Sequence, residues 1–445
     1  MKILLVYLPF CTPVSPPYSL TNLHAFLSHN SNQEIKILDL NVKFHALKFK
    51  EGQKYFQGNE WDNYETYAND YHNLTKDVYS KNNWDVVHGE RPEYFNELLQ
   101  TIRDEKPDVV AFSIVYSSQA FYAHALLKEL KDITTVIGGP AVSEKLITLA
   151  DRHFKNELEF LNFIERKEVP HQDLVFDFPL DFSIYNLKEY FTPSTVIPLK
   201  TSTTCYYQQC TFCAHYAKVP YKEYDLQNIK NTIVTSGMKH FFLIDDMIPV
   251  KRLLKLSEIF KEQHAKWGCQ LRPTKEFTAD VLQQLYDAGL TFVLWGVESG
   301  CQKTLDAIKK GTKVEDVEVV LRNAHSAGVK NVIYTMFGFP GETESDFLET
   351  IDFLKRNAEN IDLISTSIFG LQSGTPVYNN ATDYGITSIS EEERTVLEPK
   401  ISYIVEEGLS NEDAKKLRKK YASVIDGVNK YPKTMNYFRE HMFFM

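Results

Sequence analysis

The 445-residue sequence has few cysteines, no long apolar run and no excess of basic residues. Six cysteines are too few for a disulfide scaffold in a chain of this length. No segment approaches the roughly 20 apolar residues that cross a bilayer, so we expect no membrane span. The formal net charge of −10 disfavours a chain whose main partner is a nucleic-acid backbone.

The first apolar run, Ile3 to Phe10, leads into a proline-rich stretch and lacks a small-residue cleavage site. It therefore fits a buried strand better than a secretion signal, and we expect a cytoplasmic protein. Apolar residues make up 43% of the chain and charged residues 24%, which is typical of globular proteins with sizeable cores. The length suggests about three structural units.

Strand and helix patterns alternate through residues 1–146, which favours an α/β fold with a Rossmann-like parallel sheet. A polar, aromatic-rich stretch at about 46–91 interrupts the alternation. We interpret this stretch as a surface helical insertion, the alternative being a cap that faces the substrate. Residues 147–194 lose the periodicity and are predicted to form a linker. The expected strands are Lys2–Tyr7, Glu34–Leu40, Val109–Ser113 and Thr135–Ile137.

The alternation returns at residue 195 and repeats six times up to residue 376, which predicts a partial (β/α)6 barrel. Residues 377–445 are expected to form a small helical region, with helices at Glu391–Glu398 and Asn411–Tyr421. The barrel strands are expected near 196–203, 240–245, 268–272, 291–296, 331–337 and 363–369, with helices near 225–236, 251–265, 278–288, 313–327 and 343–357.

Cys205, Cys210 and Cys213 lie within nine residues, where the first barrel strand ends. In a reducing compartment such a group indicates a metal site rather than disulfides. Three thiolates on one loop can hold three irons of a [4Fe–4S] cluster and leave the fourth iron open to a small molecule. A zinc site in a binding module is the alternative, with His215 as a further ligand. Structural zinc usually joins two separated ligand pairs, and no second pair follows here.

This loop resembles the signature loop of the radical S-adenosylmethionine (SAM) superfamily. Its commonest form has three residues between the first two cysteines, whereas this chain has four. It is similar to a subgroup that reads Cys-aromatic-aromatic-x-x-Cys-x-Phe-Cys, which Phe212 fits. The resemblance implies that a reduced cluster cleaves SAM to a 5′-deoxyadenosyl radical, with a flavodoxin- or ferredoxin-type electron donor. It places SAM contacts at Phe212, Asp245, Asp246, Arg272, Glu298, Ser299, Gly338 and Pro340.

The first domain resembles the cobalamin-binding domain that precedes many such barrels. The matching pieces are the PPYSL turn, Lys106-Pro-Asp-Val-Val, Ser113-x-x-x-Ser117 and Gly138-Gly139-Pro140. Ser113, Ser117, Gly138 and Gly139 are the cobalamin contacts that this resemblance implies. The Asp-x-His-x-x-Gly motif that supplies a histidine ligand is absent, so the domain either holds cobalamin without that histidine or is an empty scaffold.

These features favour a cobalamin-dependent radical SAM methyltransferase that acts on an unactivated carbon of a small molecule or peptide. The alternative is a cobalamin-independent radical enzyme, such as an epimerase, cyclase or rearrangement enzyme. A methylthiotransferase is less favoured, because its first domain usually carries three cluster cysteines and only Cys11 precedes residue 205 here. The sequence assigns no catalytic side chain.

Overall fold

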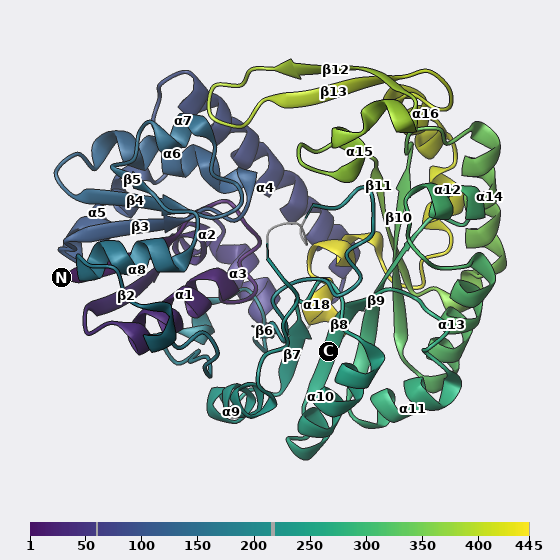
Figure 1. The fold of residues 1–445 in the computed structure, drawn as a ribbon, viewed down its shortest axis with the longest axis horizontal. Helices are drawn as coiled ribbons and strands as arrows, with labels where there is room; N and C mark the ends of the chain where they lie inside the picture. The colour runs from purple at the N-terminus through teal and green to yellow at the C-terminus, as the bar shows by residue number, and fades with distance from the viewer. Residues whose placement is uncertain (59–60, 215–218, 445) are drawn as a thin grey trace. The chain divides into compact units, whose positions relative to one another are not determined.

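The computed structural model describes residues 1–58, 61–214 and 219–444 (Figure 1). The chain divides into two compact units. The first comprises residues 1–198, 225–237 and 393–399, and the second comprises residues 199–224, 238–392 and 400–445.

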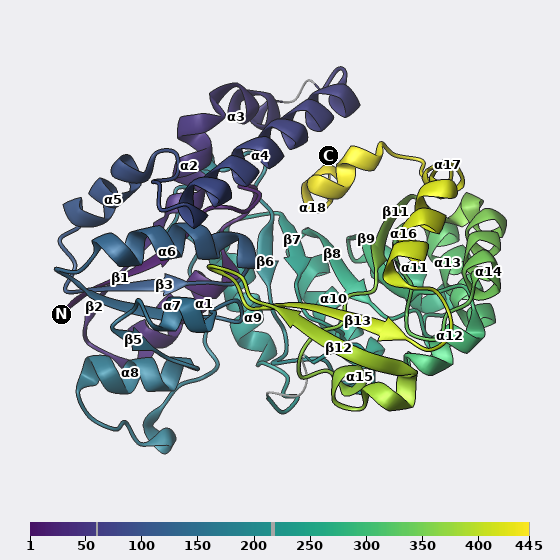
Figure 2. The same cartoon turned by 90° about the horizontal axis from the view of Figure 1, so that it is seen from above.

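The first unit is built on a five-stranded sheet in the order β2-β1-β3-β4-β5, with parallel pairing throughout. This sheet confirms the predicted Rossmann-like α/β fold. Helices α1 and α8 pack on one face of the sheet, and Figure 2 shows α5 and α6 on the other. The strands are β1 (Lys2–Tyr7), β2 (Glu34–Asp39), β3 (Val109–Ser113), β4 (Thr134–Gly138) and β5 (Arg152–His153), and the helices are α1 (Tyr18–Asn30), α5 (Phe95–Asp104), α6 (Ala120–Glu129) and α8 (Glu157–Glu165).

The stretch that was expected to be a linker contains both β5 and α8, so that expectation is wrong over these residues. Phe160, Leu161 and Ile164 of α8 are buried against the sheet. Helix α9 (Leu226–Ser236), which follows the first barrel strand in sequence, also belongs to the first unit. Its Thr232 hydroxyl accepts a hydrogen bond from the backbone N–H of Leu180, at 2.8 Å.

The aromatic insertion at about 46–91 folds into α3 (Lys50–Gln57) and α4 (Tyr64–Val87), which follow α2 (Leu40–Lys48). The rings of Tyr55 and Tyr67 stack at 3.7 Å, and Tyr71 packs edge-on against Phe56 at 5.1 Å. These aromatic side chains therefore hold α3 against α4. The insertion is helical, as predicted.

The second unit contains a six-stranded sheet whose strands follow the order of the sequence, β6 to β11. Each strand from β7 onward pairs in parallel with the next, and the connecting helices α10, α11, α13 and α14 lie on the outer face (Figure 1). The predicted six-strand parallel architecture is confirmed. The elements are β6 (Ile197–Leu199), β7 (His240–Leu243), α10 (Val250–Glu262), β8 (Lys266–Leu271), α11 (Ala279–Asp287), β9 (Leu290–Glu298), α12 (Gln302–Ala307), α13 (Val314–Ala327), β10 (Lys330–Phe337), α14 (Glu344–Arg356) and β11 (Leu363–Ile368).

The helix expected at Glu391–Glu398 is wrong, because the chain there forms part of an antiparallel hairpin, β12 (Ile386–Glu392) and β13 (Lys400–Val405). Ile389 on β12 and Ile401 and Tyr403 on β13 pack onto a buried apolar cluster. This packing overrides the helical preference of the glutamates. The C-terminal helices are α15 (Pro376–Asn379), α16 (Asn411–Lys420), α17 (Ala422–Asp426) and α18 (Arg439–Met442).

Aromatic side chains fill the amino end of the barrel. Phe292, near the start of β9, contacts Phe443 and Phe444 at ring distances of 5.3 and 5.2 Å. It also stacks on Phe242 at 5.9 Å. Gly268 is on β8, between the strands that carry Phe242 and Phe292, and a Cβ there would come within 2.5 Å of the Phe292 ring. The residues predicted to bind the cluster and SAM belong instead to the carboxyl ends of the strands and the loops that follow.

Among the described residues, no helix is both long and apolar enough to span a bilayer.

Candidate functional site

The cysteine loop follows β6 and is anchored from two sides. The Thr211 N–H donates to the carbonyl of Ile308, and the Thr211 carbonyl accepts from the N–H of Val377, both at 3.0 Å. Cys205, Cys210 and Cys213 form no disulfide with one another and are partly exposed. His215, the further ligand of the zinc alternative, lies outside the described residues.

Burial raises the pKa of the Cys210 thiol to about 11, and the nearby ammonium of Lys310 opposes this rise. Negative charge on Glu298, Cys205 and Cys213 contributes to the raised pKa, so the three sulfur atoms lie close enough to interact. Closely spaced thiolates need a compensating cation, and a metal cluster supplies one. The donor set therefore fits an iron–sulfur cluster.

Lys310 supplies buried positive charge beside this loop. Its Nζ lies 2.8 Å from Oε1 of Glu298, and the side chains of Lys310 and Glu298 are only 3% and 15% exposed. The ammonium also lies 5.9 Å from the centre of the Phe212 ring. Gly296 leaves room for the pair, because a Cβ there would come within 2.8 Å of the Lys310 Nζ.

Arg272, just beyond β8, is a second buried cation. Its Nη1 donates to the Lys310 carbonyl at 3.0 Å, and its guanidinium lies 3.6 Å from the centre of the Tyr207 ring. The Arg272 Nε is buried and has no hydrogen-bond partner among the described residues. A buried donor without an acceptor is costly, and a carboxylate is the partner that a guanidinium best accommodates. The unpartnered Nε is therefore suited to an incoming carboxylate, as the predicted contact of Arg272 with SAM requires.

Asp245 fastens the start of the cysteine loop to β7. Its carboxylate accepts hydrogen bonds from the backbone N–H and hydroxyl of Thr201 and from the hydroxyl of Ser202, at 2.6–3.1 Å. The side chain is buried, and burial raises its pKa to about 6. These partners give Asp245 a structural role. Asp246, the next residue, is half-buried, and its predicted contact with SAM stays a prediction.

Ser299 lies just beyond β9 and is directed towards α14. Its hydroxyl lies 2.9 Å from the hydroxyl of Thr350 and accepts a hydrogen bond from the N–H of Cys301 at 3.1 Å. Its predicted contact with SAM stays untested.

Gly338, just beyond β10, adopts a left-handed conformation with φ of +78°. Its N–H donates to Oε2 of Glu342, whereas Oε1 of Glu342 is buried and has no partner among the described residues. Pro340 is buried in the same loop. This loop is thus held by a buried carboxyl group, whose pKa burial raises to about 7.

The four residues predicted to contact cobalamin lie at the carboxyl edge of the sheet in the first unit. Ser113 and Gly138 pair across β3 and β4, and the Ser113 hydroxyl donates to the hydroxyl of Ser19 at 3.0 Å. Gly139 has φ of +117°, and a Cβ there would come within 2.3 Å of the Ile114 carbonyl oxygen, so packing alone requires glycine. Ser117 is exposed at the start of a short 3-10 helix, Ser117–Gln119. The four residues share one edge, but three of them already have internal roles.

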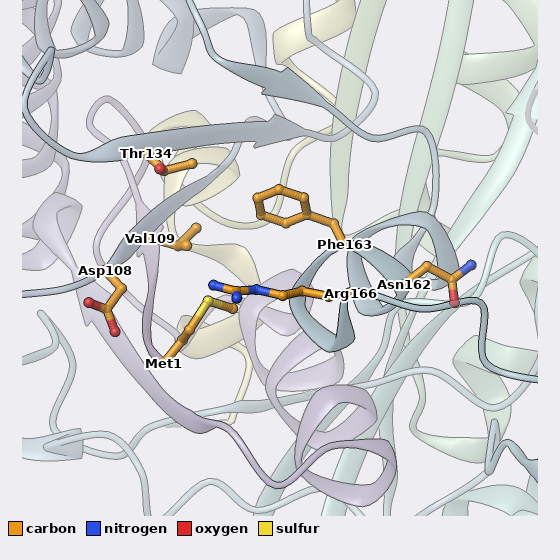
Figure 3. Close-up of a pocket in the computed structure, with 7 residues that line it drawn as sticks. All are labelled: Met1, Asp108, Val109, Thr134, Asn162, Phe163 and Arg166. Carbon is orange, nitrogen blue, oxygen red and sulfur yellow. The ribbon is translucent and has the colours of Figure 1, made fainter.

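A separate cavity of about 630 Å³ opens at the amino edge of the same sheet (Figure 3). Figure 3 shows Arg166 extending towards Met1 below the ring of Phe163. Met1, Val109 and Thr134 stand at or next to the first residues of their strands. The cavity is therefore at the opposite edge from the residues predicted for cobalamin.

Comparison with known proteins shows which family shares these features. Residues 199–354 match the radical SAM superfamily. A tRNA-2-methylthio-N(6)-dimethylallyladenosine synthase from Buchnera aphidicola is 29% identical over 162 residues, which are 35% of this chain and 34% of that protein. The bacteriochlorophyllide d C-8(2)-methyltransferase of Chlorobaculum tepidum is 25% identical over 216 residues, 44% of this chain and 47% of that enzyme. The alignments thus span less than half the length of these two curated relatives.

Two solved structures share the fold over nearly the whole chain. The cobalamin-dependent SAM radical enzyme OxsB, with aqua-cobalamin and SAM bound, aligns with a TM-score of 0.65 at 15% identity, covering 96% of this chain and 66% of that one. The radical SAM methyltransferase TsrM from Kitasatospora setae aligns with a TM-score of 0.63 at 15% identity, covering 97% and 92%. The three-cysteine loop, the parallel six-stranded sheet and the sequence match agree, and residues 199–354 form a domain of the radical SAM superfamily.

Proposed function

We propose that this protein is a cobalamin-dependent radical SAM methyltransferase that alkylates an unactivated carbon of a small molecule or peptide. Two features of one site carry the proposal. Three cysteines lie on one loop, and the buried cation Arg272 lacks an acceptor for its Nε among the described residues. The likeness of both sheets to OxsB and to TsrM, which were solved with cobalamin bound, adds support for the methyl-transfer part.

In this proposal Cys205, Cys210 and Cys213 hold the [4Fe–4S] cluster, and Arg272 orients the carboxylate of SAM. When bound, the cluster supplies the electron that cleaves SAM to methionine and a 5′-deoxyadenosyl radical, and cobalamin supplies the carrier for the transferred methyl group. The ion pair between Lys310 and Glu298 holds the turn at Lys310 in place. That turn also contacts Arg272, because Arg272 donates to the Lys310 carbonyl. Phe212 places an apolar ring beside the ammonium of Lys310.

Cobalamin would lie at the carboxyl edge of the first sheet, where open parallel sheets bind ligands. Ser113 is the half-buried hydroxyl at that edge, and the exposed Ser117 follows it. The corrin would lack the histidine of the Asp-x-His-x-x-Gly motif, because that motif is absent. The low-potential electron would come from a flavodoxin- or ferredoxin-type donor.

Cobalamin retention tests the finer part of this proposal. The cluster is reconstituted anaerobically, hydroxocobalamin is added, and corrin absorbance per chain is measured after desalting, with albumin treated in parallel to set the background. The expected result is near one equivalent of corrin, together with transfer of label from methyl-labelled SAM to a product. No corrin beside an intact cluster spectrum would contradict methyl transfer by cobalamin.

A cobalamin-independent radical enzyme is the second candidate. It is favoured by the internal roles of Ser113, Gly138 and Gly139, each of which the packing of the sheet already explains. In that case the first domain is a scaffold, and 5′-deoxyadenosine forms without any methylated product.

A further inference from the structure

We infer that Tyr207 is a positioning residue that clamps the cysteine loop to the Lys309–Gly311 turn and holds the Arg272 guanidinium in place. The inference rests on the proposed function in one respect only, namely that Arg272 receives SAM. Tyr207 lies in the gap between Cys205 and Cys210, which is one residue longer here than in the commonest radical SAM loop. The clamp therefore uses the segment in which this chain departs from that pattern.

Two contacts define the clamp. The Tyr207 hydroxyl donates to the carbonyl of Lys309 at 2.9 Å, and the Tyr207 ring lies 3.6 Å from the Arg272 guanidinium carbon. A cation so close to a ring face is held by the negative potential of that face, and the attraction is stronger where water is excluded. Arg272 is only 9% exposed, which meets that condition.

Gly311 shows that the chain accommodates this ring. Gly311 has φ of +66°, and a Cβ there would come within 2.1 Å of the Tyr207 hydroxyl oxygen and 3.0 Å of the Arg272 Nη1. No side chain fits in that space while both neighbours stay in position. The ring, the guanidinium and the glycine thus form one interlocked unit.

The same turn supplies the second contact of Arg272, because the Arg272 Nη1 donates to the Lys310 carbonyl. Tyr207 covers one face of the guanidinium, and the Lys310 carbonyl fixes one edge. The unpartnered Nε is left for an incoming anion. Loss of the ring should therefore free Arg272 to rotate and weaken SAM binding, while the three cysteines that bind the cluster remain.

The experiment compares wild type with Tyr207→Leu, Tyr207→Phe and Gly311→Ala after anaerobic reconstitution. Tyr206→Leu is the matched control, because Tyr206 is in the same loop and its ring faces Tyr221 at 6.2 Å. Iron and sulfide per chain, the dissociation constant for SAM, and the change that SAM causes in the electron paramagnetic resonance spectrum of the reduced cluster are measured.

We expect Tyr207→Leu to keep its iron, to bind SAM about tenfold more weakly and to need correspondingly more SAM for the spectral change. Tyr207→Phe, which keeps the ring, should bind SAM far better than Tyr207→Leu, and Tyr206→Leu should resemble wild type. Gly311→Ala should weaken SAM binding in the wild-type background and add little to Tyr207→Leu, because the two changes break the same unit.

Wild-type affinity and spectral change in Tyr207→Leu would overturn the inference and leave the proposed function standing. If Tyr207→Leu loses iron, the test rests on Tyr207→Phe, which keeps the ring. A Tyr207→Phe chain that keeps its iron but binds SAM as weakly as Tyr207→Leu would overturn the role of the ring. A wild-type chain that takes up no cluster would refute the proposed function and the inference together.

Discussion

Replacing Lys310 with methionine should destabilise the second unit, because the Glu298 carboxylate would then be buried without its partner. The two groups lie 2.8 Å apart and are 3% and 15% exposed. Removing one member of a buried ion pair costs about 3–5 kcal/mol. Since 1 kcal/mol shifts the Tm of a unit of 150–250 residues by about 2–4 °C, a loss of about 3 kcal/mol predicts a fall of about 6–12 °C.

Differential scanning calorimetry of the cluster-free chain measures this fall, with Lys415→Met as the matched control. Lys415 pairs with Glu412 at a similar distance, 2.9 Å, but both side chains are exposed, so its loss should cost no more than about 1 kcal/mol. The double variant Lys310→Met with Glu298→Gln should recover much of the stability, because it leaves no unpaired charge. Equal effects of Lys310→Met and Lys415→Met, or strict additivity in the double variant, would show that the unpaired buried charge does not cause the loss of stability.

Two further predictions concern buried carboxyl groups at the strand ends. Asp245→Ala should lower stability by about 3 kcal/mol or more and reduce cluster uptake, because the donors on Thr201 and Ser202 lose their acceptor; an unchanged urea midpoint would contradict this. The folded chain keeps a proton on Glu342 up to a pKa of about 7, whereas the unfolded carboxyl releases it near 4.5. The wild type should therefore lose up to about 3 kcal/mol of stability as pH rises through that window, and Glu342→Gln should not. Parallel profiles of Tm against pH for wild type and Glu342→Gln, from pH 5 to 8, would contradict this role of Glu342.

The alternation of apolar runs and helical spacing predicted the two parallel sheets, since each strand carries its burial pattern in its own residues. Periodicity could not predict the hairpin at Glu391–Glu398. Its glutamates favour a helix, whereas Ile401 and Tyr403, which pair with β12 and pack on the core, lie on the neighbouring strand. Helix α8 was missed because the prolines after it suggested a linker.

The cysteine spacing was readable from the sequence because all three ligands lie on one loop. The role of Lys310 could not be predicted from the sequence. A lysine in the run Lys309-Lys310-Gly311-Thr312-Lys313 resembles a solvated surface group, and only the fold buries it beside Glu298. Asp245 shows the converse. A carboxylate at a strand end has the same pattern whether it faces a ligand or fastens a neighbouring strand, and only the contacts with Thr201 and Ser202 distinguish these roles.

The most direct test of the account is the formation of 5′-deoxyadenosine by the reduced, reconstituted chain. The comparison is between wild type, the triple variant Cys205→Ala, Cys210→Ala, Cys213→Ala, and the control Cys301→Ala, which changes a buried cysteine directly before α12. We predict iron uptake and SAM cleavage in wild type and Cys301→Ala, and neither in the triple variant. Cleavage by the triple variant, or a wild-type chain that holds zinc and no iron, would contradict it.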